Sequence, residues 1–314
     1  MRTFFFVVSV ALSVLAVSAA AQVNLLNVPG AASSGGTGSY DPAAPGQLGS
    51  SYGQLSTYAR SYAGGQAINV LVLGDGYTQS ESSRFFQVAN RAAQAIYANP
   101  VVRSANAYQK IRFWPYFIAS ATSGASSARK GTVSTALGAT YADRYQGDTS
   151  IWVDFQKTWS IARSIQGANF QYVLVLVNCR QYAATQWSTG VCVISDFDRL
   201  VGVRNPVTFE DIVCHELLGH TIAGLWDEYV YGSVPSSNIG ASPNCDQSAQ
   251  YPKWYDLMGW QWADYAWAYV GAYAGCAHSS LYRPTYANCK MNTWASQPFC
   301  PVCRRQILAV LGEY

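Results

Sequence analysis

The stretch TFEDIVCHELLGHTIAGLWDEY, residues 208–229, concentrates the imidazole and acidic side chains of this chain. It holds two of the protein's three histidines, His215 and His220. Its carboxylates belong to Glu210, Asp211, Glu216, Asp227 and Glu228. Because only 12% of the residues in the whole chain are charged, solvation of a surface explains this concentration poorly. We interpret the stretch as a zinc site, since imidazole nitrogens and carboxylate oxygens are common zinc ligands.

The same stretch carries the start and stop signals of a helix. Thr208 stands in the N-cap position, and Asp211, three residues later, completes a capping box. The acidic side chains at 210 and 211 also favour the positive end of the helix dipole. Gly224 predicts the end of the helix, because glycine readily adopts the left-handed conformation that turns a chain off a helix. We therefore predict a helix from residue 209 to Gly224, after which the chain returns toward it.

The two histidines are one residue further apart than in the usual zinc-protease helix. That helix carries HExxH, in which ligands four apart share a face, whereas residues 215–220 of this chain form HExxxH. In an α-helix, side chains five apart point roughly 140° away from each other and cannot bind one ion. A π-bulge, which is an i→i+5 insertion common at functional sites, restores a shared face. Gly219 supplies the backbone freedom for it.

Two alternatives to the His215/His220 pair stay open. Glu216 and His220 are four apart and can form the ligand pair, with His215 displaced. The added residue can also abolish metal binding, so that both histidines are hydrogen-bonded members of a core helix.

Three blocks of sequence resemble the IgA-peptidase family of zinc metalloendopeptidases. HELLGHTIAGLWDEY at 215–229 is similar to the family signature HExGHxxAGLxDEY, with one added residue before Leu218. VLVLGDGYTQSE at 70–81, and YRPTYANCKM followed by PFCPVC within 282–303, agree in the same order. The resemblance covers residues 66–310 and implies a metzincin-like zinc-protease catalytic domain.

The resemblance also implies the remaining site residues. In some metzincin-like proteases an aspartate that follows the histidine helix supplies the third zinc ligand, so the candidates here are Asp227 and, one residue further, Glu228. Met291 is a candidate for the Met-turn beneath the zinc, or an ordinary core methionine. Tyr229 and Tyr282 are candidate hydrogen-bond donors to the oxyanion of the reaction.

The predicted reaction is hydrolysis of a protein or peptide substrate by an endopeptidase. Zn²⁺ held by His215, His220 and one acid lowers the pKa of water toward neutrality and polarises the peptide carbonyl. Glu216 takes the proton of that water and later protonates the leaving amine. His278, the third histidine, is a further candidate ligand. If the added residue spoils the site, the chain is instead a catalytically inactive secreted binding or structural protein on the same scaffold.

The N-terminal residues predict export and a single folded domain. Residues 1–21 combine an early cation, an apolar run and small residues, which is typical of a secretory signal peptide. Residues 22–65 are rich in Gly, Ser, Ala and Pro, so we expect a flexible leader or a propeptide. Residues 66–314 then form one metallopeptidase domain, with an upper subdomain at 66–225 and a lower subdomain at 226–314.

The pattern of the upper subdomain predicts an α/β fold with a twisted mixed sheet. Strands are expected at 68–73, 111–119, 171–177 and 190–195. Helices are expected at 78–98 and 151–166, ahead of the histidine helix. Pro115 favours an edge position or a bulge for the second strand. We expect the strand at 190–195 to be the edge that pairs with an extended peptide.

Eight cysteines in an exported chain predict a disulfide framework. They are Cys179, Cys192, Cys214, Cys245, Cys276, Cys289, Cys300 and Cys303. Cys179 and Cys192 lie on successive predicted strands and are expected to form one bridge. The last four cysteines can alternatively form a structural zinc site of the C-x2-C type, but an oxidising compartment favours disulfides. We therefore expect the irregular C-terminal subdomain to be disulfide-rich.

Charge and hydropathy disfavour other classes of partner. The net charge is only +3, without a basic cluster, so no interaction with nucleic acid is expected. No apolar run of about 18 residues follows the predicted signal peptide, so no membrane association is expected after its removal. We expect a monomer in the extracellular space.

Overall fold

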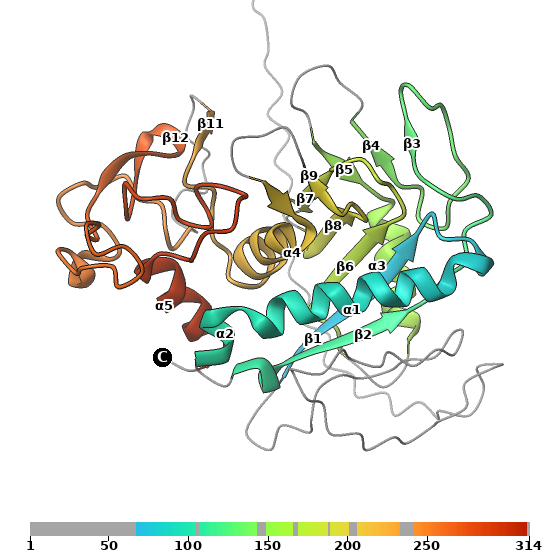
Figure 1. The fold of residues 1–314 in the computed structure, drawn as a ribbon, viewed down its shortest axis with the longest axis horizontal. Coiled ribbons are helices and arrows are strands. Elements are labelled where there is room, and N and C mark those ends of the chain that lie inside the picture. The colour runs from blue at the N-terminus through green and yellow to red at the C-terminus, as the bar shows by residue number, and fades with distance from the viewer. Residues whose placement is uncertain are drawn as a thin grey trace, which may run out of the picture.

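The fold was determined as a computed structural model, which describes residues 67–104, 107–142, 149–165, 169–187, 189–200, 206–232 and 242–312. The predicted signal peptide at 1–21 and the predicted leader at 22–65 lie outside these residues. A mixed sheet, helices and an irregular C-terminal region make up the described fold, which confirms the α/β prediction (Figure 1).

The central sheet has five strands in the order β2-β1-β6-β8-β7. Their bounds are β1 Ile68–Asp75, β2 Ile111–Tyr116, β6 Tyr172–Val177, β7 Ala184–Trp187 and β8 Val191–Ser195. The first four strands in this order are parallel, and β7 runs antiparallel to β8. Of the two possibilities that Pro115 leaves open, β2 is an edge strand, although it ends at Tyr116 rather than at residue 119.

The other edge of the sheet is β7, so the prediction that residues 190–195 form an edge strand is wrong. In β8, Val193 is paired with Val175 of β6 on one side and with Thr185 of β7 on the other. The sequence of β7 is ATQW, and most of it is only half-buried. It therefore lacks the apolar run by which a buried strand is recognised.

Alternation along the strands divides the core into two layers. Successive side chains of a strand point to opposite faces of its sheet. Val72 of β1 belongs to the same buried cluster as helix α1 (Ser82–Ala98) and the histidine helix. Leu73 belongs to a second cluster, which includes side chains of α3 (Phe155–Ser164). The sheet is thus covered on both faces, and the histidine helix packs on the α1 side.

The predicted helix at 78–98 is present. It begins with a 3-10 turn, η1 (Gln79–Glu81), where the Thr78 N–H donates to Glu81 Oε2 at 2.8 Å, and it continues as α1. Pro100 follows the end of α1 and starts a short helix, α2 (Pro100–Ser104). Among the described residues, no helix combines the length and apolarity needed to cross a bilayer.

The helix predicted at 151–166 is shorter than expected. Residues at its predicted start form a strand, β5 (Ile151–Trp152), and Trp152 is exposed. The helix α3 begins only after Asp154, whose carboxylate accepts the Lys157 N–H at 2.9 Å. The aromatic spacing indicated the helix, but the N-cap of Asp154 sets where it begins.

The remaining elements are short, except in the C-terminal region. They are η2 (Ala107–Lys110), β3 (Ser126–Ser127), β4 (Thr140–Tyr141), β9 (Arg199–Leu200), β10 (Val207–Thr208) and η5 (Tyr255–Leu257). In the C-terminal region, β11 (Val230–Gly232) pairs with β12 (Tyr273–Arg283), and α5 (Pro301–Val310) ends the fold. This region, orange to red in Figure 1, lies on one side of α4 (Phe209–Ile212), and the sheet lies on the other.

The cysteines form one disulfide, between Cys245 and Cys276, and the other six are free and buried. The predicted Cys179–Cys192 bridge is wrong. The parallel register of β6 and β8 places Cys192 beside Leu174, whereas Cys179 lies beyond the end of β6. The two cysteines also belong to the clusters on opposite faces of the sheet. The alternative prediction is a zinc site formed by Cys276, Cys289, Cys300 and Cys303. It is wrong for this set of four, because Cys276 forms the disulfide with Cys245.

Candidate metal centre

The helix that carries the two histidines begins and ends as predicted. It starts as α4 (Phe209–Ile212), where Thr208 Oγ1 accepts the Asp211 N–H at 3.2 Å and the Thr208 N–H donates to Asp211 Oδ2 at 3.1 Å. It continues as η3 (Val213–Ile222), which is π-helical over 10 residues. The predicted bulge is therefore a longer π-helical segment. Gly224, with a φ of 65°, turns the chain off the helix.

The π-helical winding places His215 and His220 on one face. A π-helix pairs residue i with residue i+5, so side chains five apart come together. The two Nε2 atoms lie 3.1 Å apart. Asp227 Oδ1 lies 3.0 Å from Nε2 of His215 and 3.2 Å from Nε2 of His220. Three potential metal-ligand atoms thus converge on one point.

The second ring nitrogen of each histidine is held by a backbone carbonyl oxygen. His215 Nδ1 lies 2.8 Å from the Lys290 carbonyl oxygen, and His220 Nδ1 lies 2.7 Å from that of Leu225. A carbonyl oxygen only accepts, so each Nδ1 is a donor, and each Nε2 faces the same point and can coordinate there once it is unprotonated. A backbone acceptor on the second ring nitrogen is typical of metal-bound histidines. With the Asp227 carboxylate, three ligand atoms would be available to one metal ion.

The two consecutive acids after the helix point in different directions. Asp227 contacts the histidines, whereas Glu228 is fully buried with its Oε1 3.1 Å from the Cys303 sulfur. Of the two acids that the sequence left open as third ligand, the structure therefore brings Asp227 to the histidines. The alternative pair of Glu216 and His220, with His215 displaced, is not the arrangement found.

Asp227 and the histidines shift each other's pKa values. Burial opposes protonation of His220, but the Asp227 carboxylate outweighs this effect and raises the pKa of His220 to about 9. Burial alone would raise the pKa of Asp227, yet the neighbouring histidines hold it well below its ordinary value. Asp227 is therefore ionised, which is the form that binds a cation.

Glu216 lines a cleft of about 910 Å³ together with His220 and Asp227. Burial raises the pKa of Glu216, although the two histidines and a hydrogen bond from the backbone of Gln186 oppose the rise. Gln186 belongs to β7, so the edge of the sheet borders the cleft beside the carboxylate.

Two aromatic residues of the cleft were missed by the sequence analysis. Tyr182 and Trp294 both line it, with ring centroids 5.8 Å apart. Burial and the charges of Glu216 and Asp227 raise the pKa of Tyr182, so its hydroxyl keeps its proton. Tyr182 lies in the connection between β6 and β7, where no periodicity distinguishes it from the other tyrosines of the chain.

The two tyrosines that the sequence singled out have different positions. Tyr229 lines the cleft, and burial and the Asp227 charge raise its pKa. Tyr282 is not among the residues that line it. Its backbone on β12 is paired with Asp246, with the Tyr282 N–H donating at 2.8 Å. The structure therefore does not bring Tyr282 into the lining of the cleft. His278, also on β12, lies opposite Gly232 and outside the His215, His220 and Asp227 group.

Met291 and Lys290 lie under the histidine helix. Met291 is fully buried, and a Cβ atom added to Gly219 would lie 2.5 Å from its sulfur. Lys290 holds His215 through its carbonyl oxygen and donates from Nζ to Asp211 Oδ1 at 2.8 Å. These contacts tie the C-terminal region to both ends of the helix segment 211–219.

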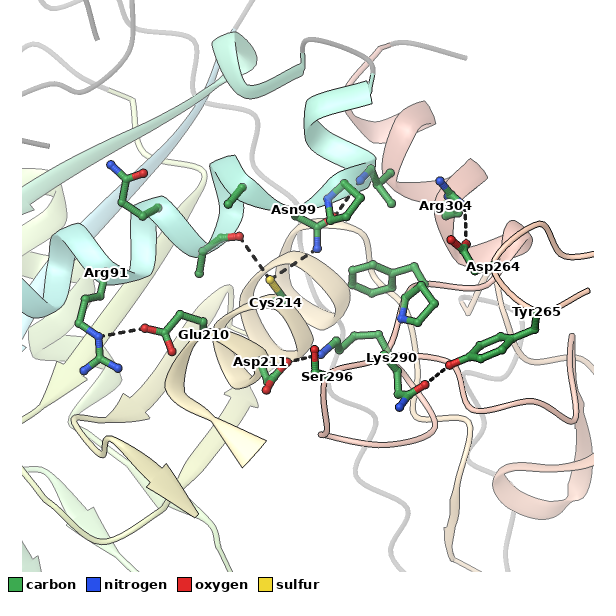
Figure 2. Close-up of a pocket in the computed structure, with 18 of the residues that line it drawn as sticks. Arg91, Asn99, Glu210, Asp211, Cys214, Asp264, Tyr265, Lys290, Ser296 and Arg304 are labelled. Atoms are coloured by element: carbon green, nitrogen blue, oxygen red, sulfur yellow. Dashed lines mark hydrogen bonds and ion pairs between the residues drawn. The ribbon is translucent and has the colours of Figure 1, made fainter. Parts of the chain in front are cut away.

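A second cavity, of about 980 Å³, lies beside the start of the same helix. Figure 2 shows Lys290 reaching Asp211 in this cavity, with Cys214 and Asn99 nearby. It shares no lining residue with the cleft that contains Glu216. Its charged groups are paired with each other, so we assign the chemistry to the cleft.

The family model described as IgA Peptidase M64 matches residues 58–263 of the chain. The matched span is more than half of the 314 residues and includes the histidine helix and both acids that follow it. No match was found among curated proteins.

Proposed function

The chain belongs to the IgA peptidase M64 family, and from this premise we propose that it is a secreted zinc-dependent endopeptidase. Family membership implies a metallopeptidase that acts on proteins. The observation that carries the zinc proposal is the convergence of His215 Nε2, His220 Nε2 and Asp227 Oδ1 within 3.2 Å of one another. The fold that we propose is metzincin-like, with Met291 beneath the metal as its Met-turn.

His215, His220 and Asp227 are the proposed ligands. Zinc bound by three such ligands lowers the pKa of water toward neutrality and polarises a peptide carbonyl. The second nitrogen of each imidazole is fixed by a backbone carbonyl, so the rings keep their orientation whether or not substrate is present.

Glu216 is the proposed general base. It stands next to His215 in the sequence, lines the cleft, and is almost completely buried. Burial favours its neutral form, so its carboxylate is a stronger base than an exposed glutamate and can accept the proton of the attacking water. The protonated Glu216 then donates that proton to the leaving amine.

Tyr182 and Tyr229 are the proposed donors to the developing oxyanion. Both line the cleft, and both hydroxyls keep their protons because their pKa values are raised. A donor aimed at the developing charge lowers the barrier more than it stabilises the bound substrate.

The edge strand β7 is the proposed site for the substrate backbone. Ala184, Thr185 and Gln186 line the cleft, and β7 has no strand on its outer side in the described sheet. An extended peptide can add to such an edge by main-chain hydrogen bonds. This pairing would place a scissile carbonyl along the wall that contains Glu216.

Glu216→Gln tests the proposal. We expect casein cleavage by the purified protein to fall by at least about 10²-fold, because proton transfer is lost, with bound zinc unchanged by elemental analysis. Glu210→Gln is the matched control, since Glu210 lies on the same helix and pairs with Arg91 outside the cleft. A wild-type protein without zinc and without cleavage would instead support a catalytically inactive binding or structural protein.

A further inference from the structure

Three cysteines and one glutamate form a second cluster of potential metal ligands. The sulfurs of Cys289, Cys300 and Cys303 and a carboxylate oxygen of Glu228 all lie within 4.8 Å of one another. Each of the four residues has an exposed fraction of 0%. We propose that this cluster is a structural Zn²⁺ site, separate from the histidine centre, with these four side chains as its ligands.

The separations within the cluster match a tetrahedral thiolate site. The Cys289 and Cys303 sulfurs are 3.9 Å apart, and Glu228 Oε1 lies 3.7 Å from Cys300 Sγ and 3.1 Å from Cys303 Sγ. With Zn–S bonds of about 2.3 Å, neighbouring sulfurs of a tetrahedral site are about 3.8 Å apart. A disulfide would require about 2.05 Å. The Cys289 and Cys303 sulfurs therefore stand at ligand distance, and all three cysteines are free of disulfide bonds.

The local structure places a helix N-terminus and backbone N–H donors at the sulfurs of the cluster. Cys300 and Cys303 form a C-x2-C pair at the start of α5, with Cys300 as the N-cap and Pro301 as the first helical residue. The positive end of a helix stabilises a thiolate, and C-x2-C is a common zinc-ligand spacing. Cys289 Sγ accepts N–H groups from Met291 at 3.5 Å and from Cys300 at 3.2 Å. These donors reduce the cost of holding negative sulfur in the interior.

Glu228 provides an independent observation that points to a cation. Its Oε1 accepts from Asn244 Nδ2 at 3.2 Å, but its Oε2 is buried and has no hydrogen-bond partner in the described part of the chain. Arg283 donates to the main-chain oxygen of Glu228, at 3.0 Å. A buried carboxylate with an unsatisfied oxygen is costly unless a cation compensates it. A divalent metal held with the three sulfurs would do so.

The two metal sites are linked through neighbouring residues. Asp227 immediately precedes Glu228, and Lys290, whose carbonyl oxygen accepts from His215, immediately follows Cys289. A metal on Glu228 and Cys289 would therefore fix the direction of Asp227 and the position of the Lys290 carbonyl. This positioning effect rests on the proposed function, whereas the existence of the cysteine site does not.

Metal content of the secreted full-length protein tests the cysteine site. We expect two zinc ions per chain in the wild type by inductively coupled plasma mass spectrometry, and one in Cys303→Ser. The matched control is Cys179→Ser, which removes a buried free cysteine outside the cluster and should retain both ions. His220→Ala should lose the other ion. If the histidine centre fails instead, the wild type binds one ion that His220→Ala keeps and Cys303→Ser loses.

Two measurements on proteins with an intact cluster keep the test independent of misfolded variants. The wild type is first unfolded in denaturant with a chelator and without a reductant. An alkylating reagent should then modify Cys289, Cys300 and Cys303. Co²⁺-substituted His220→Ala should show near-ultraviolet thiolate-to-cobalt charge transfer, because the histidine centre contains no sulfur ligand. A disulfide between any two of the three cysteines, or a single zinc that survives Cys303→Ser, would overturn the proposal.

Discussion

The sulfur of Met291 packs against Gly219 so closely that a Cβ atom at position 219 would lie 2.5 Å from it. Met291 has little room to move, because it is fully buried and its carbonyl oxygen accepts the Glu228 N–H at 2.7 Å. The glycine between the two histidines therefore has a packing role as well as a backbone role. It lets the segment that carries Lys290 and Met291 approach the π-helical segment.

Gly219→Ala should destabilise the protein by about 1–3 kcal/mol, because the new methyl group overpacks the contact with Met291. Urea unfolding of the zinc-loaded protein measures this cost. The double variant Gly219→Ala/Met291→Ala is the control, since removal of the thioether makes room for the added Cβ. Its cost should be less than the sum of the two single costs by about 0.5–3 kcal/mol. Additive costs would contradict a direct steric contact.

Lys290→Met should destabilise the protein by about 3–5 kcal/mol, because it leaves the Asp211 carboxylate buried without its cation. The side chains of Lys290 and Asp211 are only 5% and 11% exposed, and their charged atoms are 2.8 Å apart. Urea unfolding again provides the measurement. Arg180→Met breaks the ion pair with Asp198, whose members are 62% and 72% exposed, and should change stability little. Equal effects of the two substitutions would argue against a buried pair.

Features that depend on a residue's own backbone chemistry were predictable from the sequence. Thr208 marked the start of the histidine helix, Gly224 its end, and Pro115 an edge strand. The need for π-helical winding followed from the spacing of the ligands alone, although its length did not. Each of these predictions uses only local geometry, so no knowledge of the tertiary arrangement was required.

Features that depend on strand order and side-chain direction were not predictable in the same way. Cys179 and Cys192 are near in sequence, but the parallel register of β6 and β8 separates them. The sequence could not distinguish Asp227 from Glu228, because the backbone conformation after the helix decides which of these two consecutive carboxylates faces the histidines. Tyr182 lines the cleft because it lies just before β7, and β7 is a half-buried edge strand without a periodic pattern in its sequence.

Tyr182→Phe should lower kcat/KM for peptide hydrolysis by about 10²-fold, because one donor to the developing oxyanion is lost. Zinc content and KM should stay near wild-type values, since the ring still lines the cleft. Tyr282→Phe is the matched control, because Tyr282 lies on β12 outside the cleft lining. If Tyr182→Phe keeps full activity while Tyr229→Phe loses it, the donor is Tyr229 alone.

Removal of the metal should change how stability depends on pH. Without zinc, Asp227 raises the pKa of His220 from 6.5 to about 9 against the effect of burial. Because the pKa is higher in the folded state, this pairing stabilises fully below pH 6.5 and its contribution is lost as the pH rises through about 9. Zinc requires neutral imidazole, so in the loaded protein the His220 contribution should instead rise up to about pH 6.5 and then stay constant.

The difference in melting temperature between wild type and His220→Gln isolates this contribution from other groups that titrate in the same range. In chelator, that difference should shrink between pH 6.5 and about 9, the window set by the raised pKa of His220. In excess zinc it should remain constant over the same window, because the imidazole is unprotonated in both the folded and the unfolded chain. A difference that is independent of pH in chelator would show that Asp227 and His220 are not paired in the metal-free fold. The contact at 3.2 Å between His220 Nε2 and Asp227 Oδ1 would then form only around a bound ion.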